Sequence, residues 1–279
     1  MLELNERKSM KAKIRLCYRL FSLLLLFGAG LIIAAGLFPA IGCACSDIRA
    51  RTLRDAIKRR WLQCFAVLIC LRVDLKGKPS GQRAMLAANH VSWLDIIVIG
   101  QYLPAYFVAK SDIAGWPVIG FLSRQAGTVF IRRGDKKNIA VTSDKIACLL
   151  EQNCTVIAFP EGTTTAGNEV LNFHASLFQP ALSTKSAVQP VSIQYQGATK
   201  DLAPFIGDET FIGHLLKMLM LDKIEATLCF LPCIATEGKT RHRISQETRE
   251  KIAAHLSIEP SSAEPDTEFE PIALPMGPV

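Results

Sequence analysis

The longest uncharged stretch of the chain lies near its N-terminus and limits most strongly how the chain can fold. Residues 20–46 form a run of 27 residues without a charged side chain. As a helix, residues 20–38 extend over about 28 Å, close to the thickness of the hydrocarbon layer of a bilayer. Pro39 is expected to end this helix. The length of the stretch and the basic flank after it favour a retained membrane anchor over a signal peptide, whose apolar core has about 7–15 residues.

The positive charge of the protein is concentrated around this stretch. The whole chain of 279 residues has a formal net charge of +7, whereas residues 1–60 contain 12 Lys or Arg and 4 Asp or Glu. Basic side chains beside an apolar helix favour an anionic membrane surface, and the pattern is not typical of nucleic-acid binding. The two flanks carry six basic residues each, so the positive-inside rule does not orient the helix. The segment can therefore span the bilayer or enter one leaflet.

The pattern of the chain predicts four regions. Residues 1–46 are a basic arm and membrane anchor, and residues 47–80 are an amphipathic helix, on the membrane or against the core, with a linker. Residues 81–257 alternate short apolar runs with helical patterns, which predicts an α/β domain with a mostly parallel sheet flanked by helices. Residues 258–279, with five Pro and five Asp or Glu, are predicted to be a disordered tail.

The nine cysteines have no metal-ligand spacing, so they predict reduced thiols and no metal site.

The expected elements of this domain follow from its apolar periodicity. Strands are expected at residues 84–88, 106–109, 128–131, 155–159, 188–195 and 224–231. Helices are expected at residues 93–101, 116–123, 135–151 and 245–256.

The most informative motif is Asn89-His90-Val91-Ser92-Trp93-Leu94-Asp95, between a predicted strand and a predicted helix. Ligands of α/β sheets gather at the carboxyl ends of strands, where this motif lies. If His90 is in the turn and Asp95 in the first helical turn, the carboxylate can hold one imidazole nitrogen and leave the other free to accept a proton. The alternative is structural: Ser92 and Asp95 have the spacing of a capping box, and His90 can be an ordinary turn residue.

Two further stretches carry groups suited to anion binding. In GTVFIRR, residues 127–133, alternation places the two arginines on opposite faces of a strand, and arginine matches the geometry of phosphate oxygens. In FPEGTTT, residues 159–165, a glycine-containing turn with hydroxyl groups supplies hydrogen-bond donors. By itself, the first stretch is better explained as an ordinary basic turn, and the second can also be an ordinary Pro-Glu-Gly turn.

In this order, the motifs resemble those of the glycerolipid acyltransferase family, in particular its lysophosphatidic acid acyltransferases. The matching stretches are NHVSWLD at residues 89–95, GTVFIRR at 127–133, FPEGT at 159–163 and VQPV at 188–191. The resemblance covers roughly residues 55–235. It implies the α/β fold of that family, with an apolar opening that faces the membrane.

The resemblance also implies a role for each motif residue. His90 would be the general base on the acceptor hydroxyl, and Asp95 would orient it and stabilise its charge. The acceptor site would consist of Arg133, Glu161, Gly162 and Thr163, supported by Asn89, Ser92, Gly127 and Pro160. The acyl donor would be an acyl-carrier-protein or coenzyme A thioester, used directly as a co-substrate without a further cofactor.

These implications predict an enzyme of the cytoplasmic membrane with its active site on the cytoplasmic side. Its partners would be membrane lipids and a lysolipid acceptor, most simply 1-acyl-glycerol-3-phosphate, which would give phosphatidic acid. Thr164 stands where the phosphate-specific members have a basic residue. It resembles the bacterial relatives that acylate lyso-ornithine lipid, which is the alternative acceptor. Two further functions stay open for these motifs: a non-catalytic membrane-binding protein with the same fold, and a histidine-based lipid hydrolase.

Overall fold

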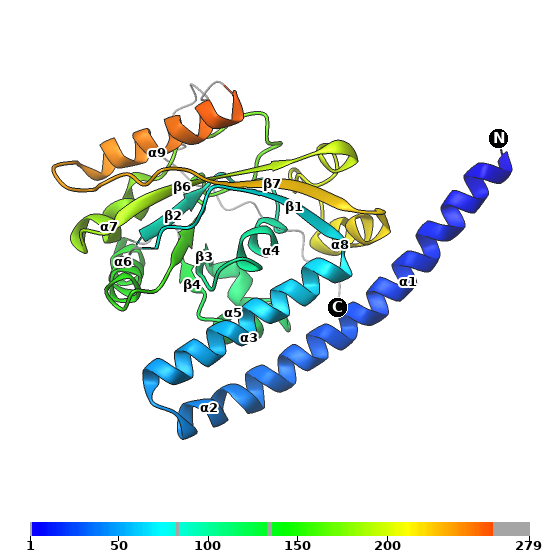
Figure 1. Cartoon of the computed structure of the whole chain (residues 1–279), viewed down its shortest axis with the longest axis horizontal. Helices are drawn as coiled ribbons and strands as arrows, with labels where there is room; N and C mark the ends of the chain where they lie inside the picture. Colours follow the sequence, from blue (N-terminus) through cyan, green and yellow to red (C-terminus); the bar gives the residue numbers. More distant parts are fainter. Residues whose placement is uncertain (1, 82–83, 133–135, 259–279) are drawn as a thin grey trace.

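The protein is a three-layer α/β structure with a long helical hairpin beside it (Figure 1). The computed structural model describes residues 2–81, 84–132 and 136–258. Its seven-stranded sheet has the order β1-β7-β6-β2-β5-β3-β4. Every neighbouring pair is parallel except β6 and β7, which confirms the mostly parallel sheet. The strands are β1 Leu71–Lys76, β2 Ala84–Ala88, β3 Tyr106–Lys110, β4 Val129–Ile131, β5 Val156–Ala158, β6 Ala187–Tyr195 and β7 Ile224–Phe230.

Helices cover both faces of this sheet, and each face has its own apolar core. One core contains helix α6 (Lys136–Glu151), α7 (Gln179–Ser183) and α9 (Arg241–Leu256). The other contains α3 (Asp47–Leu68), α4 (Asp95–Gly100) and α8 (Phe211–Met220), with α5 (Ile119–Gln125) on the same side in Figure 1. Three short 3₁₀ segments lie in the loops of this domain: η2 Ser111–Gly115, η3 Ala175–Phe178 and η4 Gly197–Thr199.

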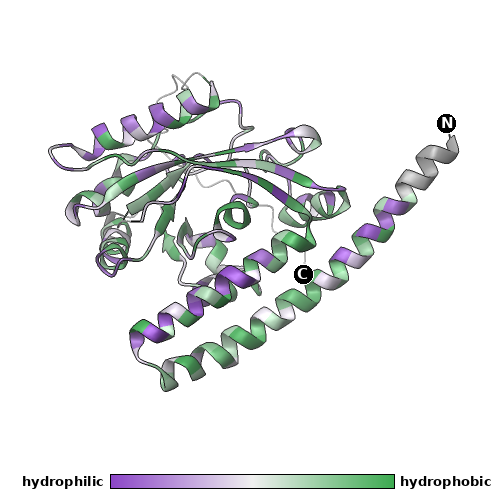
Figure 2. Cartoon of the chain, viewed as in Figure 1, coloured by the Kyte–Doolittle hydropathy of each residue, from purple (hydrophilic) through white to green (hydrophobic). Residues whose placement is uncertain are grey.

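The N-terminal helix is longer than the sequence predicts, because Pro39 does not end it. Helix α1 (Leu2–Ile32) continues through a π-helical segment, η1 (Ile33–Leu37), into α2 (Phe38–Ala44). Pro39 lies in the first turn of α2, and the wider π turn before it accommodates a residue that cannot donate to the preceding turn. Residues Met10–Ala44 form one helix that is long and apolar enough to cross a membrane, which makes it a candidate membrane segment (Figure 2).

Two arginines attach α1 to the α/β domain. The buried guanidinium of Arg19 donates to the carbonyl oxygens of Leu219, Leu221 and Asp222 at the end of α8, at 3.1, 2.5 and 3.1 Å. Arg15 pairs with the side chain of Asp222. These carbonyls are left over at the end of a helix, so a guanidinium is a suitable partner for them. Helix α1 is therefore packed as part of the domain.

Some elements differ from the sequence predictions. Residues 71–76, expected to belong to the helix and linker before residue 81, form edge strand β1, which pairs in parallel with β7. Helix α8 was not predicted, and α9 begins at Arg241 instead of Ser245 because the side chain of Thr240 caps it. Helix α4 begins at Asp95, two residues after the expected start. The predicted tail lies outside the described residues, apart from Ile258.

Candidate active site

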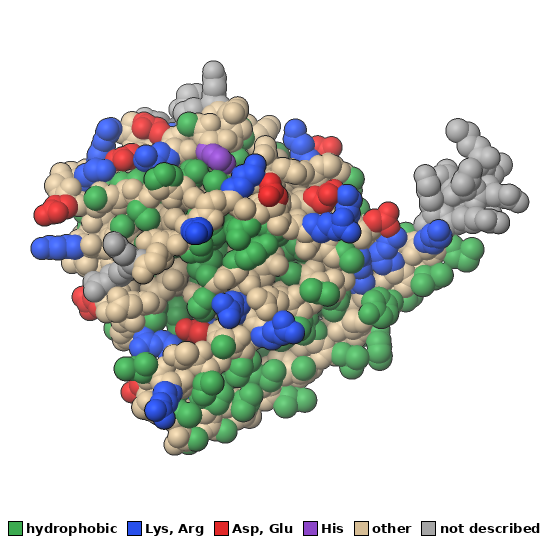
Figure 3. Space-filling model, viewed as in Figure 1, with side chains coloured by type: hydrophobic (Ala, Val, Ile, Leu, Met, Phe, Trp, Pro, Cys, Tyr) green, Lys and Arg blue, Asp and Glu red, His purple; other side chains and the backbone are tan. Residues whose placement is uncertain are grey.

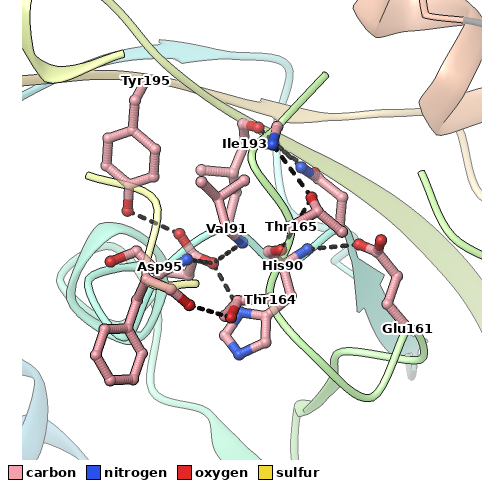
Figure 4. Close-up of polar contacts among 12 residues, drawn as sticks. His90, Val91, Asp95, Glu161, Thr164, Thr165, Ile193 and Tyr195 are labelled. Carbon is pink, nitrogen blue, oxygen red and sulfur yellow. Dashed lines mark hydrogen bonds and ion pairs between the residues drawn. The ribbon is translucent and has the colours of Figure 1, made fainter. Parts of the chain in front are cut away.

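The predicted pair of His90 and Asp95 meets at the carboxyl end of β2 (Figure 4). His90 lies in the turn after the strand, and Asp95 is the first residue of α4. Nδ1 of His90 is 2.8 Å from Oδ2 of Asp95. Because an ionised carboxylate only accepts, Nδ1 carries the proton, and Nε2 is left as the acceptor. The imidazole is 20% exposed, and Nε2 has no hydrogen-bond partner among the described residues.

Asp95 fulfils both of the roles that the sequence left open. Its Oδ2 also accepts the backbone N–H groups of Val91 and Ser92, at 2.8 and 3.0 Å, as the acidic residue of a capping box does. Its Oδ1 accepts the hydroxyl of Tyr195 at 2.7 Å. The carboxylate is completely buried, so these donors are what keep a charge there tolerable. Ser92 does not complete the box, because its buried Oγ has no hydrogen-bond partner among the described residues.

Three contacts from the loop after β5 hold the His90 turn. Oε1 of Glu161 accepts the backbone N–H of His90 at 2.7 Å, and the carbonyl of His90 accepts the N–H of Thr165 at 2.9 Å. The Phe159 ring stacks on the imidazole, with the ring centroids 4.1 Å apart. Strands β2 and β5 are parallel neighbours, so their carboxyl ends bring these loops together.

Glu161, which the resemblance implies in the acceptor site, is buried beside this turn. Its second oxygen, Oε2, accepts the N–H of Leu171 at 2.9 Å, and only 3% of the residue is exposed. Burial raises the pKa of Glu161 to about 8, although the backbone donors of Leu171 and His90 act in the opposite direction. Its contacts therefore give it a role in holding the turn.

The other predicted residues of the FPEGT stretch have distinct surroundings. Pro160 is buried, and its carbonyl accepts the N–H of His174 at 2.9 Å. Gly162 is buried with a φ of 75°, a conformation that favours glycine. Thr163 is exposed. Thr164 points its hydroxyl to the carbonyl oxygen of Phe205, to which it donates a hydrogen bond.

Asn89 joins the turn to strand β6. Its side-chain amide donates to the carbonyl of Ile193 at 3.0 Å and accepts the N–H of Ile193 at 2.8 Å. The amide thus continues the pairing of β2 with β6 beyond Ala88, which is opposite Val191. Asn89 therefore fastens the start of the turn to β6, and its supporting role in the reaction stays a prediction.

The GTVFIRR stretch is only partly described and lies farther along the sheet. Gly127 precedes β4 with a φ of 82°, and a Cβ there would be 2.7 Å from the ring of Tyr106, so glycine is needed for packing at that point. Arg132 is exposed after β4. Arg133, the predicted phosphate ligand, lies outside the described residues.

Sequence reasoning missed a second layer of contacts around the turn. The indole Nε1 of Trp93 donates to Nδ1 of His214 at 2.9 Å, and Nε2 of His214 is 3.1 Å from the carbonyl oxygen of Leu202. Burial lowers the pKa of His214, which fits a neutral ring between these two partners. The partner of Trp93 is on α8, more than 100 positions later in the sequence, and the partner of Asp95 is on β6, 100 positions later. Only the amphipathicity of the helix and the alternation of the strand could have pointed to these residues.

One cavity among the described residues lies away from this site. It has a volume of about 250 Å³ and lies at the opposite edge of the sheet, between the start of α3 and the entries of β3 and β5, where Arg51, Tyr106 and Cys154 line it. The pair of His90 and Asp95, called the dyad below, is instead at the carboxyl ends of the strands, where the imidazole reaches the surface.

Known proteins of similar sequence identify the family of this chain. A family model described as Acyltransferase matches residues 72–194. A lyso-ornithine lipid O-acyltransferase of Pseudomonas aeruginosa is 33% identical over 88% of this chain and 95% of the relative. A 1-acyl-sn-glycerol-3-phosphate acyltransferase of Neisseria meningitidis is 32% identical over 67% of this chain and 76% of the relative.

A solved structure shares the fold. The 1-acyl-sn-glycerophosphate (LPA) acyltransferase PlsC of Thermotoga maritima superimposes with a TM-score of 0.62 at 21% identity, covering 86% of this chain and 96% of that chain. The chain belongs to the acyltransferase family, and it is an enzyme of the lysolipid acyltransferase type.

Proposed function

We propose that this enzyme transfers a fatty acyl group from a thioester of acyl carrier protein or coenzyme A to the free hydroxyl of a lysolipid, with His90 as the general base. Nε2 of His90 removes the hydroxyl proton while the oxygen attacks the thioester carbonyl. The tetrahedral intermediate then collapses, and the sulfur leaves as a thiol with the proton from the imidazolium. An ester bond forms and a thioester bond breaks, without an acyl-enzyme.

The contact of 2.8 Å between Nδ1 of His90 and the buried Oδ2 of Asp95 carries this proposal. The carboxylate keeps the imidazole in the tautomer that can accept a proton at Nε2, and it stabilises the imidazolium that forms during attack. The stacked Phe159 ring and the Glu161 contact restrict the rotation of the base. A fixed base lowers the barrier because its orientation is set before the acceptor binds.

We infer that the acceptor is lyso-ornithine lipid. Thr164 occupies the position that is basic in the phosphate-specific group, and its hydroxyl is used to bind the carbonyl of Phe205. This position therefore offers no cation to a phosphate. The match to the Pseudomonas aeruginosa lyso-ornithine lipid O-acyltransferase extends over 95% of that relative, which supports the same acceptor.

The second candidate acceptor is 1-acyl-glycerol-3-phosphate. The arginines of the GTVFIRR stretch favour it, as does the Neisseria meningitidis relative with that acceptor in its name. If it is the acceptor, Arg133 would bind the phosphate and the product would be phosphatidic acid.

We further propose that the enzyme works at the cytoplasmic membrane, with the active site on the cytoplasmic side. The outer face of α1 exposes large apolar side chains at helical spacing, namely Ile14, Tyr18, Phe21, Leu25 and Ile32. Figure 3 shows hydrophobic side chains along this helix on the side away from the domain. An exposed apolar face of this length fits the hydrocarbon of a lipid layer. A membrane-bound enzyme would meet its lysolipid acceptor in the layer where the lipid resides.

A side-by-side acceptor assay tests the proposed function. The purified full-length protein is given a labelled acyl-carrier-protein or coenzyme A thioester, with lyso-ornithine lipid and 1-acyl-glycerol-3-phosphate in separate reactions. We expect labelled diacyl product with lyso-ornithine lipid at a kcat/KM at least about tenfold higher. A higher value with the phosphate acceptor would select the second candidate. Labelled free fatty acid as the main product with either acceptor would indicate a hydrolase.

A charged residue at position 164 tests the reason for this preference. Thr164→Arg introduces a cation where the phosphate-specific group has one, so we expect the ratio of the two kcat/KM values to move about tenfold toward 1-acyl-glycerol-3-phosphate. Thr164→Val is the matched control, because it removes the hydroxyl without adding charge and should leave the ratio unchanged. An equal change of the ratio in both variants would contradict a role for charge at this position.

A further inference from the structure

The carboxylate of the dyad has a partner that the proposed mechanism does not use. The hydroxyl of Tyr195 donates to Oδ1 of Asp95 at 2.7 Å, while the other oxygen, Oδ2, holds the imidazole and two backbone N–H groups (Figure 4). Tyr195 and Asp95 are both buried. Oδ1 has no other hydrogen-bond partner among the described residues.

The position of Tyr195 follows from the register of the sheet. Ala88, the last residue of β2, is opposite Val191 of β6, so β6 extends four residues beyond β2 and runs beside the His90 turn. Ile193 and Tyr195 are two positions apart and lie on the same face of the strand. Ile193 binds Asn89 at the start of the turn, and Tyr195 binds Asp95 at its end. Strand β6 therefore holds both ends of the catalytic turn.

We propose that Tyr195 is a positioning residue of the reaction, which acts through Asp95 to orient His90 and to set how strongly the carboxylate favours the imidazolium. This inference rests on the proposed role of His90 as the base. A hydrogen bond to Oδ1 keeps the carboxylate from rotating about its bond to Cβ, so Oδ2 stays directed at Nδ1. The same bond draws negative charge toward Oδ1 and weakens the attraction of Oδ2 for a protonated imidazole.

The phenol can fulfil this role over the whole working range of pH. Burial, with the charge of Asp95 as a smaller cause, raises the pKa of Tyr195 well above its usual range, so the hydroxyl stays protonated and remains a donor. Among the described residues, Glu161 and His214 also contact the turn: the pKa of Glu161 is raised to about 8 and its Oε1 accepts the N–H of His90, whereas burial lowers the pKa of His214, which accepts the indole N–H of Trp93. The test must separate the titration of Glu161 from that of the dyad.

The test compares Tyr195→Phe with wild-type full-length enzyme, using labelled thioester donor and lysolipid acceptor between pH 5 and pH 10. We expect kcat to fall about tenfold, with the KM for the acceptor changed less than about twofold, because the orientation of the base is lost and the acceptor site is not. We expect the acidic limb of the pH–rate profile to move upward by about half a unit or more, since the carboxylate then favours the imidazolium more strongly. An acidic limb at the wild-type position would overturn the proposal, even if stability were lower.

Matched variants make the result specific. Tyr102→Phe removes a half-buried phenol whose bond, to the carbonyl of Val73 at 3.5 Å, is remote from the dyad, and it should change neither kcat nor the profile. Site-specific fluorotyrosine at position 195 keeps the shape but donates a stronger hydrogen bond, and it should move the acidic limb downward. It also carries the test if Tyr195→Phe does not fold. A limb that moves in the same direction in both variants would overturn the proposal.

Two further variants separate this inference from the proposed function and from Glu161. If His90→Ala retains wild-type turnover, the proposed base is wrong and the inference falls with it. If His90→Ala is inactive while Tyr195→Phe has the wild-type profile, only the inference fails. In a Glu161→Gln background, Tyr195→Phe should shift the acidic limb by the same amount as in the wild-type background. A shift that disappears there would assign the limb to Glu161 and overturn the role of Tyr195.

Discussion

The turn that contains His90 and Asp95 and the N-terminal helix differ in where their polar and apolar groups find partners. In the turn, the buried carboxylate of Asp95 has four hydrogen-bond donors from within the protein. On α1, apolar side chains are exposed, with Ile32 75% exposed, and no part of the described chain covers them. A buried polar group must find its partner inside the fold, whereas an exposed apolar face obtains its partner from outside. The carboxylate is therefore satisfied within the fold, whereas the exposed face of α1 is suited to a lipid layer.

Helix α8 connects these two regions. The end of α8 receives the buried guanidinium of Arg19 from α1. Farther along the same helix, His214 accepts the hydrogen bond of Trp93, which is two residues before Asp95. The position of the candidate membrane segment relative to the dyad is thus set by hydrogen bonds through one helix. Together with the apolar packing, these contacts fix how the dyad sits relative to the helix that is proposed to meet the lipid.

Removing the proposed base should have the largest effect on acyl transfer and should not change the N-terminal helix. For His90→Ala we expect about a 10³-fold loss of kcat, because a positioned general base contributes about 10²–10⁴-fold. Membrane binding and the folded circular dichroism spectrum should be unchanged, since the side chain is at the rim of the sheet. The measurement is acyl transfer from labelled thioester, with vesicle sedimentation in parallel. Turnover within tenfold of wild type would show that the turn is not the catalytic region.

Substitutions on the exposed face of α1 test the other half of the comparison. Phe21→Ser combined with Leu25→Ser removes two exposed apolar side chains without touching the domain. If both are inserted in lipid, burial of about 1.5–3 kcal/mol for each predicts at least about a 100-fold weaker partition into anionic vesicles. Val141→Ser, on the exposed side of α6, is the control and should bind like wild type. Equal binding of the double variant would contradict insertion of this face.

The smallest effect is expected from the buried carboxyl of Glu161. Its pKa is raised from 4.5 to about 8 by burial, so the folded protein holds this proton more tightly than the unfolded chain between these two values. The contribution of Glu161 to stability therefore falls as the pH rises through this window, by about 2 kcal/mol from pH 5 to pH 7. In Glu161→Gln this decline should be absent. The measurement is urea unfolding at several pH values, and parallel pH slopes for the two proteins would refute it.

Much of the fold could be predicted because the local pattern agrees with the tertiary structure. Residues 84–88 form the predicted strand with the predicted boundaries. A short, fully apolar run between turns is stable as a strand when helices cover both faces of its sheet. Strand β1 was missed because it is an edge strand with exposed charged residues, and its pairing with β7 joins residues about 150 positions apart. The continuation of the helix through Pro39 was missed because a π turn is not evident from periodicity.

By itself, the sequence determined the class of fold, the long apolar N-terminal segment, and the pair of ionisable side chains at the end of the first buried strand. These depend on short-range spacing, which a linear pattern records. Only the tertiary structure decided that Asp95 caps the turn and holds His90 at the same time. It also decided that the buried Glu161 accepts a backbone hydrogen bond from the turn, and that Tyr195 donates to the second oxygen of Asp95. Those partners come from separate strands and loops. Their meeting depends on strand order and register, which follow from the packing of the whole chain and not from any local pattern.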